Sequence, residues 1–208
     1  MSTLVLVRHG QARPFQPNSD CLSETGIQQG IQLGEYWREH GIAFDEVYSG
    51  TLLRHRQTAE AAGFKDYQAL PEFNEYNAEA ILRAHPDWAP PTDNRHLQKM
   101  FDVALPQWIA AKLEAPGVES WADFHGRVER GFRQIIDADK PSRRVVVFTS
   151  AGPIGVMLQI ALCAPEQTAI ELHWRVRNCS ITELVFTRDR VSLDRFNTTP
   201  HLREVTFR

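Results

Sequence analysis

Three side chains in this sequence are of the types that hold and transfer a phosphoryl group. Arg8 and His9 follow directly on a short apolar run, and Arg54 lies just beyond a second predicted strand. A guanidinium group donates paired hydrogen bonds to phosphate oxygens, and a neutral imidazole can attack phosphorus to form a covalent phosphoenzyme. A lone histidine at a strand end is usually structural, but the flanking Arg8 and Gly10 favour catalysis here. The three side chains predict metal-independent phosphoryl transfer, which mainly needs positioning and neutralised charge.

The strands that must position these residues are predicted from short apolar segments. Residues 4–7 and 144–148 have the continuous apolar character of strands buried on both faces, and residues 44–49 predict a third strand. If these strands are parallel, their carboxyl ends meet at one edge of the sheet, where α/β proteins bind their ligands. We therefore expect the residues that follow the three strands to converge there on one anion.

Helical periodicity and capping residues predict helices between the strands. Ser23 and Ser120 can cap two of them, and Gly41 stands where the first should stop. The predicted helices cover residues 23–37, 51–62, 120–138 and 154–162, while residues 149–153 are expected to form a turn and residues 181–186 and 191–196 two terminal strands. This alternation predicts an α/β fold of three layers, with a mostly parallel sheet flanked by helices, as a single domain over residues 1–208.

Residues 76–116 interrupt this pattern, because they carry five of the twelve prolines of the chain. Two short helices with an irregular join are expected there. Two interpretations of the segment have equal weight: a lid or insertion over the site, or a surface segment with no role in the site.

The composition narrows the classes of function. A net charge of −3 argues against nonspecific nucleic-acid binding, which needs a basic surface, so a local basic cluster must meet any anionic ligand. No apolar run reaches the ~20 residues that cross a bilayer, and the first residues lack the basic and apolar regions of a signal peptide. Cys21, Cys163 and Cys179 are scattered, without the spacing of a metal site. We expect a cytoplasmic protein with no metal or cofactor, which binds neither nucleic acid nor membrane; its oligomeric state stays open.

The segment Leu6–Gln11 (LVRHGQ) resembles the opening signature of the histidine phosphatase superfamily, which includes the cofactor-dependent phosphoglycerate mutases. Further similar segments follow in the same order, at residues 22–34, 47–59, 117–128 and 178–182. The resemblance thus extends from residue 4 to about residue 186 and implies a phosphoglycerate mutase-like fold.

The resemblance also implies roles for individual residues. His9 becomes the phosphorylated histidine, and Arg8 and Arg54 grip the phosphate. A carboxylic acid protonates the leaving oxygen and later activates water. The match of Phe73-Asn74-Glu75 to the family's Leu-Asn-Glu points to Glu75, with Glu72 as the fallback. The implied activity is a metal-independent phosphatase that acts through phosphohistidine on an unidentified small phosphorylated substrate.

Ser150 is the clearest departure from the family, because it stands where the third segment should carry a second histidine. As a phosphate-binding residue, Ser150 can donate one hydrogen bond but supplies no charge. Loss of one preorganised donor typically costs about 2.7–4 kcal/mol of barrier. Slower chemistry is therefore expected unless another cation replaces the missing one. Ala12, where many members carry a hydroxyl residue, is a second departure.

His55, His173 and Arg56 are the candidates to supply the missing charge. His55 adjoins Arg54 but points about 100° around the helix from it, so direct help from this side chain is not predicted. We favour packing or surface roles for both histidines.

Two other functions compete with hydrolysis. A catalytically weakened member would bind phosphorylated ligands or a partner protein without efficient turnover, as Ser150 suggests. A mutase is less favoured, because it needs a shielded phosphohistidine and a second basic clamp, for which Arg83, Arg95 and Lys99 are the candidates. A nucleotide-binding P-loop is excluded, because residues 151–155 lack the Lys-Ser/Thr ending.

Overall fold

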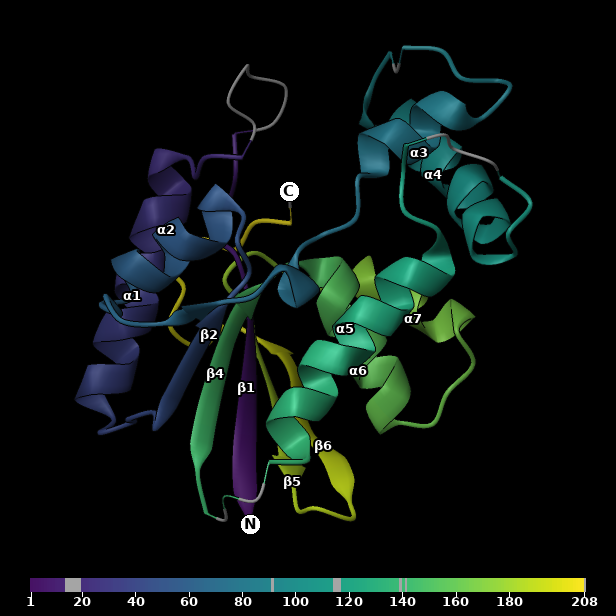
Figure 1. Ribbon diagram of the computed structural model, residues 1–208. Helices are drawn as coiled ribbons and strands as arrows, with labels where there is room; N and C mark the ends of the chain where they lie inside the picture. The colour runs from purple at the N-terminus through teal and green to yellow at the C-terminus, as the bar shows by residue number, and fades with distance from the viewer. Residues whose placement is uncertain (14–19, 91, 114–116, 139, 141, 208) are drawn as a thin grey trace.

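The computed structural model describes residues 1–13, 20–90, 92–113, 117–138, 140 and 142–207 of the 208-residue chain. Within them, the strands form a six-stranded sheet in the order β3-β2-β4-β1-β5-β6 (Figure 1). The strands are β1 (Ser2–Arg8), β2 (Glu46–Ser49), β3 (Gln68–Ala69), β4 (Arg144–Thr149), β5 (Ile181–Phe186) and β6 (Val191–Thr198). β1 to β4 lie side by side and parallel, whereas β5 pairs antiparallel with β1, and β6 antiparallel with β5. The sheet is therefore mixed, with the predicted parallel strands together on one side.

Apolar side chains alternate between the two faces of the inner strands, so that both faces are buried. In β1, Leu4 and Leu6 belong to one hydrophobic core, whereas Val5 and Val7 belong to the core on the other face. α1 (Glu24–Glu39) and α2 (Leu53–Ala61) cover the second of these faces, opposite the remaining helices. The predicted three-layer α/β arrangement is confirmed.

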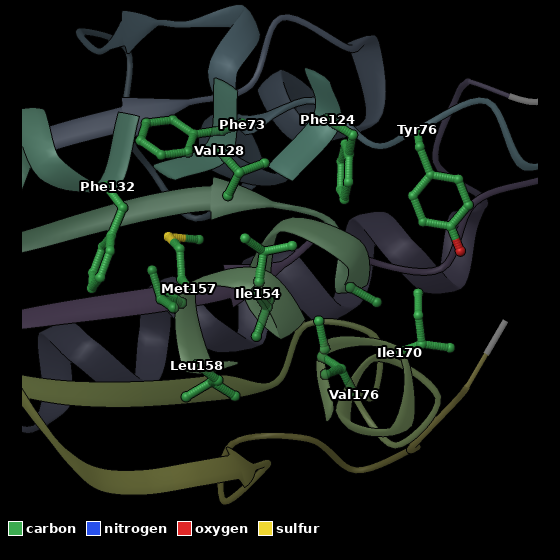
Figure 2. Packing of buried hydrophobic residues seen from close by; sticks show 14 of the residues in the cluster. Phe73, Tyr76, Phe124, Val128, Phe132, Ile154, Met157, Leu158, Ile170 and Val176 are labelled. Carbon is green, nitrogen blue, oxygen red and sulfur yellow. The ribbon is translucent and has the colours of Figure 1, made fainter. Parts of the chain in front are cut away.

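α5 (Trp121–Ile136) and α6 (Ala151–Ala161) form the centre of the larger core. Figure 2 shows Phe124, Val128 and Phe132 of α5 facing Ile154 and Met157 of α6. The three α5 residues recur at the spacing of one helical turn, which is the pattern that predicted this helix.

The first turn of α6 corrects one prediction. Residues 151–153, which were expected to form a turn, are helical. Pro153 fits there because the N–H groups of a first helical turn have no acceptor within the helix. α7 (Gln167–His173), which packs against α6, is a helix that the sequence pattern does not predict.

The segment over residues 76–116 follows a short 3₁₀ helix, η1 (Pro71–Phe73), and forms α3 (Ala78–Ala84) and α4 (Asn94–Ile109). α4, with 16 residues, is longer than predicted. Both helices lie beyond the carboxyl ends of the parallel strands (Figure 1). The roles of this segment as a lid and of the whole chain as a single domain stay predictions. In the part of the chain that the structure describes, no helix is both long and apolar enough to cross a membrane.

Candidate functional site

The carboxyl ends of β1, β2 and β4 meet at one edge of the sheet, where the sequence placed the site. Arg8 at the end of β1 pairs with Thr149 at the end of β4, and Ser49 at the end of β2 pairs with Phe148. The pairing continues past the strand, because the backbone N–H of His9 donates to the carbonyl of Thr149 at 2.8 Å. The expected convergence of the strand ends is therefore present.

His9 is buried, with 7% of its surface exposed, and its ring is held in one orientation. Its Nδ1 lies 2.7 Å from the carbonyl oxygen of Gly10. Since a carbonyl only accepts hydrogen bonds, Nδ1 carries the proton and Nε2 keeps its lone pair. Burial, followed by the guanidinium charges of Arg54 and Arg8, holds the pKa of His9 well below its ordinary value. The imidazole is thus neutral and nucleophilic at neutral pH.

The loop that carries His9 is tied to the helix that carries Arg54. The backbone N–H of Gly10 donates to Oγ1 of Thr58 at 3.0 Å, and that hydroxyl donates to the carbonyl of Arg54 at 2.7 Å. Gly10 also packs against Gly26 of α1, where a Cβ on Gly10 would lie 2.4 Å from the Gly26 carbonyl oxygen. These contacts fix the spacing between the imidazole and the first turn of α2.

Arg54 forms an ion pair that the sequence analysis did not include. Its Nη1 lies 2.7 Å from Oδ1 of Asp20, and Oδ2 of Asp20 accepts from the backbone N–H of Leu53 at 2.8 Å. Asp20 thereby serves as the cap of α2, since Leu52 at the cap position makes no side-chain hydrogen bond to the helix. No local sequence signal could identify Asp20, because it lies more than 30 residues before its partners.

Arg8 reaches the end of the chain. Its Nη1 donates to the carbonyls of Val176 and Phe207, the second at 2.9 Å. Arg8 therefore links the end of β1 to the segment before β5 and to the C-terminal residues. Because both acceptors are backbone atoms, no side-chain type in the sequence indicates this contact.

Glu75 lies at the N-terminus of α6. Its Oε2 accepts from the backbone N–H of Gly152 at 3.1 Å, and its Oε1 accepts from the N–H of Tyr76 at 3.2 Å. Burial raises the pKa of Glu75, although these bonds and the charges of Arg54 and Arg8 oppose the rise. A carboxyl with a raised pKa can deliver a proton near neutral pH.

Glu72, the fallback acid, lies elsewhere. A Cβ on Gly131 of α5 would lie 2.7 Å from the Cβ of Glu72, so this residue packs against α5. By contrast, the charges of Arg54 and Arg8 lower the pKa of Glu75 as they lower that of His9. The geometry therefore favours Glu75 as the partner of His9.

Ser150 and His55 form a buried pair beside His9. Both side chains have no exposed surface, and Nε2 of His55 lies 2.6 Å from Oγ of Ser150. The centroids of the His55 and His9 rings are 5.7 Å apart. The position of His55 one residue after Arg54 did not predict this contact, which depends on how closely α2 approaches the end of β4.

The remaining candidates lie apart from this pair. Arg56 is exposed, and His173 lies on α7, where its Nε2 is 3.3 Å from the hydroxyl of Tyr76. Arg83 forms an exposed ion pair with Glu79, and Arg95 and Lys99 are exposed on α4. Among the described residues, no group of three or more His, Cys, Asp or Glu side chains is arranged to hold a metal ion.

Comparison with known protein families identifies one match over nearly the whole chain. A family model described as the histidine phosphatase superfamily (branch 1) matches residues 4–199. Among curated proteins, a 2,3-bisphosphoglycerate-dependent phosphoglycerate mutase of Lactobacillus acidophilus is 37% identical over 68 residues, which cover 30% of each chain. A broad-specificity phosphatase of Saccharomyces cerevisiae is 41% identical over 61 residues, which cover 26% of each chain. The matched segments thus span less than a third of these relatives.

Solved structures share the fold along nearly the whole chain. The phosphoserine phosphatase of Entamoeba histolytica in complex with 3-phosphoglyceric acid has a TM-score of 0.69 at 20% identity, covering 97% of this chain and 99% of that one. Bacillus stearothermophilus YhfR has a TM-score of 0.71 at 18% identity, with the same coverage. At these identities the likeness establishes the fold alone.

Proposed function

Because this chain belongs to the histidine phosphatase superfamily, we propose that it hydrolyses a small phosphomonoester through a phosphohistidine formed on His9. The observation that carries the proposal is the state of the His9 ring. Its Nδ1 is bonded to the Gly10 carbonyl, its Nε2 keeps the lone pair, and the charges of Arg8 and Arg54 act on it. A neutral nucleophile between two cations fits attack on a phosphate dianion.

In the first step, Nε2 of His9 forms a bond to phosphorus as the bond from phosphorus to the leaving oxygen breaks. Glu75 transfers its proton to that oxygen, which departs as an alcohol. Arg8 and Arg54 stabilise the negative charge on the phosphoryl oxygens, and Ser150 donates one hydrogen bond.

In the second step, water attacks phosphorus and the Nε2–phosphorus bond breaks. The Glu75 carboxylate accepts the proton of the attacking water, so that phosphate leaves with neutral His9 and protonated Glu75 restored. These proposed steps use only side chains of the chain itself.

The test is hydrolysis of p-nitrophenyl phosphate, followed by phosphoserine and 3-phosphoglycerate, by the wild type and His9→Ala. The two physiological compounds are chosen because the E. histolytica phosphatase of the same fold is described in complex with them. We expect His9→Ala to abolish turnover and acid-labile phosphate incorporation. His40→Ala, at the exposed histidine that follows α1 as its C-cap, should retain both. Equal rates for the wild type and His9→Ala would contradict the proposal.

A second candidate function is binding of phosphorylated ligands without efficient turnover. The serine at position 150 favours it, because a hydroxyl cannot supply the charge of an imidazolium. On this alternative, inorganic phosphate should raise the melting temperature of the wild type by mass action while every tested ester stays intact. A cytoplasmic location remains part of the proposal, as does a small phosphorylated ligand.

A further inference from the structure

We propose that His55 is a positioning residue of the phosphate site, whose Nε2–H donates to Ser150 Oγ and thereby directs the Ser150 hydroxyl hydrogen toward a phosphoryl oxygen at His9. The inference rests on the proposed function, since it assigns a donor to the same anion site. It also gives a role to a buried histidine that the two chemical steps do not use.

The surroundings of Nδ1 determine which nitrogen of His55 carries the proton. A Cβ built on Gly50 would lie 2.1 Å from Nδ1 of His55, so a hydrogen of the glycine already points at this nitrogen. A hydrogen on Nδ1 would collide with it, whereas a lone pair makes a weak C–H contact. Nδ1 also has no hydrogen-bond partner among the described residues. The proton therefore sits on Nε2, 2.6 Å from Ser150 Oγ.

The Ser150 hydroxyl can donate as well as accept a hydrogen bond. A hydroxyl has one hydrogen to donate and two lone pairs. Since one lone pair accepts from Nε2–H of His55, the hydrogen must point to another acceptor. Apart from His55, no acceptor within hydrogen-bond distance of Ser150 Oγ is found in the described residues. A bound anion beside His9 would provide one.

The Ser150 side chain does not cap α6, although it stands in the position to do so. Ser150 stands at the cap position, where a serine oxygen usually accepts from the N–H two or three residues later. The N–H of Gly152 donates instead to Glu75, and Pro153 has no N–H. Neither position 152 nor position 153 therefore offers an N–H to the Ser150 oxygen, and Ser150 makes no side-chain cap hydrogen bond.

The electrostatics agree with this assignment. Burial, followed by the charge of Arg54, holds the pKa of His55 well below its ordinary value. A neutral His55 keeps one N–H and one lone pair, as the contacts require. The pair thus supplies an oriented neutral donor in place of a charged one.

Two substitutions of similar size separate orientation from packing. His55→Gln can place an amide N–H near the position of Nε2, whereas His55→Leu fills the space without a donor. We expect His55→Leu and Ser150→Ala each to lower kcat by roughly 10²–10³-fold. The double variant should be no worse than Ser150→Ala alone, and His55→Gln should recover most of the activity lost in His55→Leu. Melting temperatures verify that each variant is folded, and His40→Leu is the matched control.

The same variants are titrated with inorganic phosphate, so that the test does not depend on turnover. Weaker phosphate binding in His55→Leu, with recovery in His55→Gln, supports the inference even if no ester is hydrolysed. Equal losses in His55→Gln and His55→Leu, or losses that multiply in the double variant, would overturn it. If His9-dependent hydrolysis persists in that case, only the role of His55 fails. If the wild type neither hydrolyses esters nor binds phosphate, the proposed function fails with it.

Discussion

The backbone N–H of Gly152 donates to Oε2 of Glu75 at 3.1 Å, which joins the first turn of α6 to the loop after η1. The contact needs a glycine, because a Cβ at position 152 would lie 2.0 Å from Oε1 of the same carboxyl. The proposed acid is therefore held by a helix N-terminus that approaches it without a side chain.

Gly152→Ala should displace Glu75 and lower kcat on an alkyl phosphate at least tenfold. The added methyl group overpacks a closed site, which typically costs about 1–3 kcal/mol of stability unless the carboxyl moves away. Steady-state kinetics and the melting temperature measure the two effects separately.

Gly126→Ala is the matched control for this substitution. Gly126 is also helical, but a Cβ there would meet only Arg130 Nη1, at 3.6 Å. This variant should keep full activity. Its free energy of unfolding should rise by about 0.5–1 kcal/mol, because alanine is favoured over glycine in a helix interior. Equal activity losses at both glycines would contradict a specific effect of the contact between Gly152 and Glu75.

Arg54→Gln should raise the pKa of His9 toward its ordinary value. The charge of Arg54 is the largest influence after burial that lowers this pKa, and its removal lets the imidazole protonate at higher pH. The acid limb of kcat/KM should move to higher pH, and the rate should fall by roughly 10²–10³-fold. Arg56→Gln changes an exposed arginine on the same helix and should leave the His9 titration in place. NMR titration of the His9 ring distinguishes the two.

Glu46→Gln should destabilise the fold without touching the site. Burial of the Glu46 carboxyl would raise its pKa, but hydrogen bonds from Arg143, Tyr48 and Lys140 bring the pKa below its ordinary value. Arg143 is buried and bonds Glu46 at 2.7 Å, so the variant leaves a charge poorly paired and should cost about 1–3 kcal/mol.

The pH dependence of this contribution has a definite sign. Because the folded-state pKa of Glu46 is lowered, its stabilisation is present above the unfolded-state pKa and is lost as the pH falls through the folded-state pKa. Urea unfolding of the wild type and the variant should therefore converge at low pH. Glu79→Gln, which breaks an exposed ion pair with Arg83, should change stability by less than about 0.5 kcal/mol throughout.

The sequence predicted those parts of the fold that leave a periodic pattern. β1 and β4 are continuous apolar runs because both faces of the sheet are covered, and α5 shows its apolar stripe because one face meets α6. α7 was missed because it is short and the side chain of Glu166, at its cap position, makes no hydrogen bond to the helix. A helix without a cap or a long stripe has little local signature.

The site was predictable as far as strand ends determine it. His9 and Arg54 follow strands whose parallel pairing brings their ends together, so their proximity follows from the topology. The contact of His55 with Ser150 does not follow from the topology. It depends on the missing Cβ of Gly50 and on how closely α2 approaches the end of β4. Such contacts are set by tertiary packing, which no spacing in the sequence records.

Glu75→Gln separates the two proposed proton transfers. Glutamine keeps an acceptor for the Gly152 N–H but cannot give up or take a proton near neutral pH. Because burial raises the pKa of Glu75, the wild-type kcat/KM should fall as the pH rises through that pKa and the acid form is lost. The variant should lack this alkaline limb and lose roughly 10²–10⁴-fold in kcat on an alkyl phosphate.

On p-nitrophenyl phosphate the same variant should behave differently, since nitrophenolate leaves without a proton. His9 should still be phosphorylated, but water attack should be slow because the Glu75 carboxylate that accepts its proton is missing. Acid-labile phosphohistidine should therefore accumulate in rapid-quench experiments, after a burst of nitrophenolate equal to the enzyme concentration. An unchanged alkaline limb would assign proton donation to a residue other than Glu75, and turnover without accumulation would assign activation of the water to another residue.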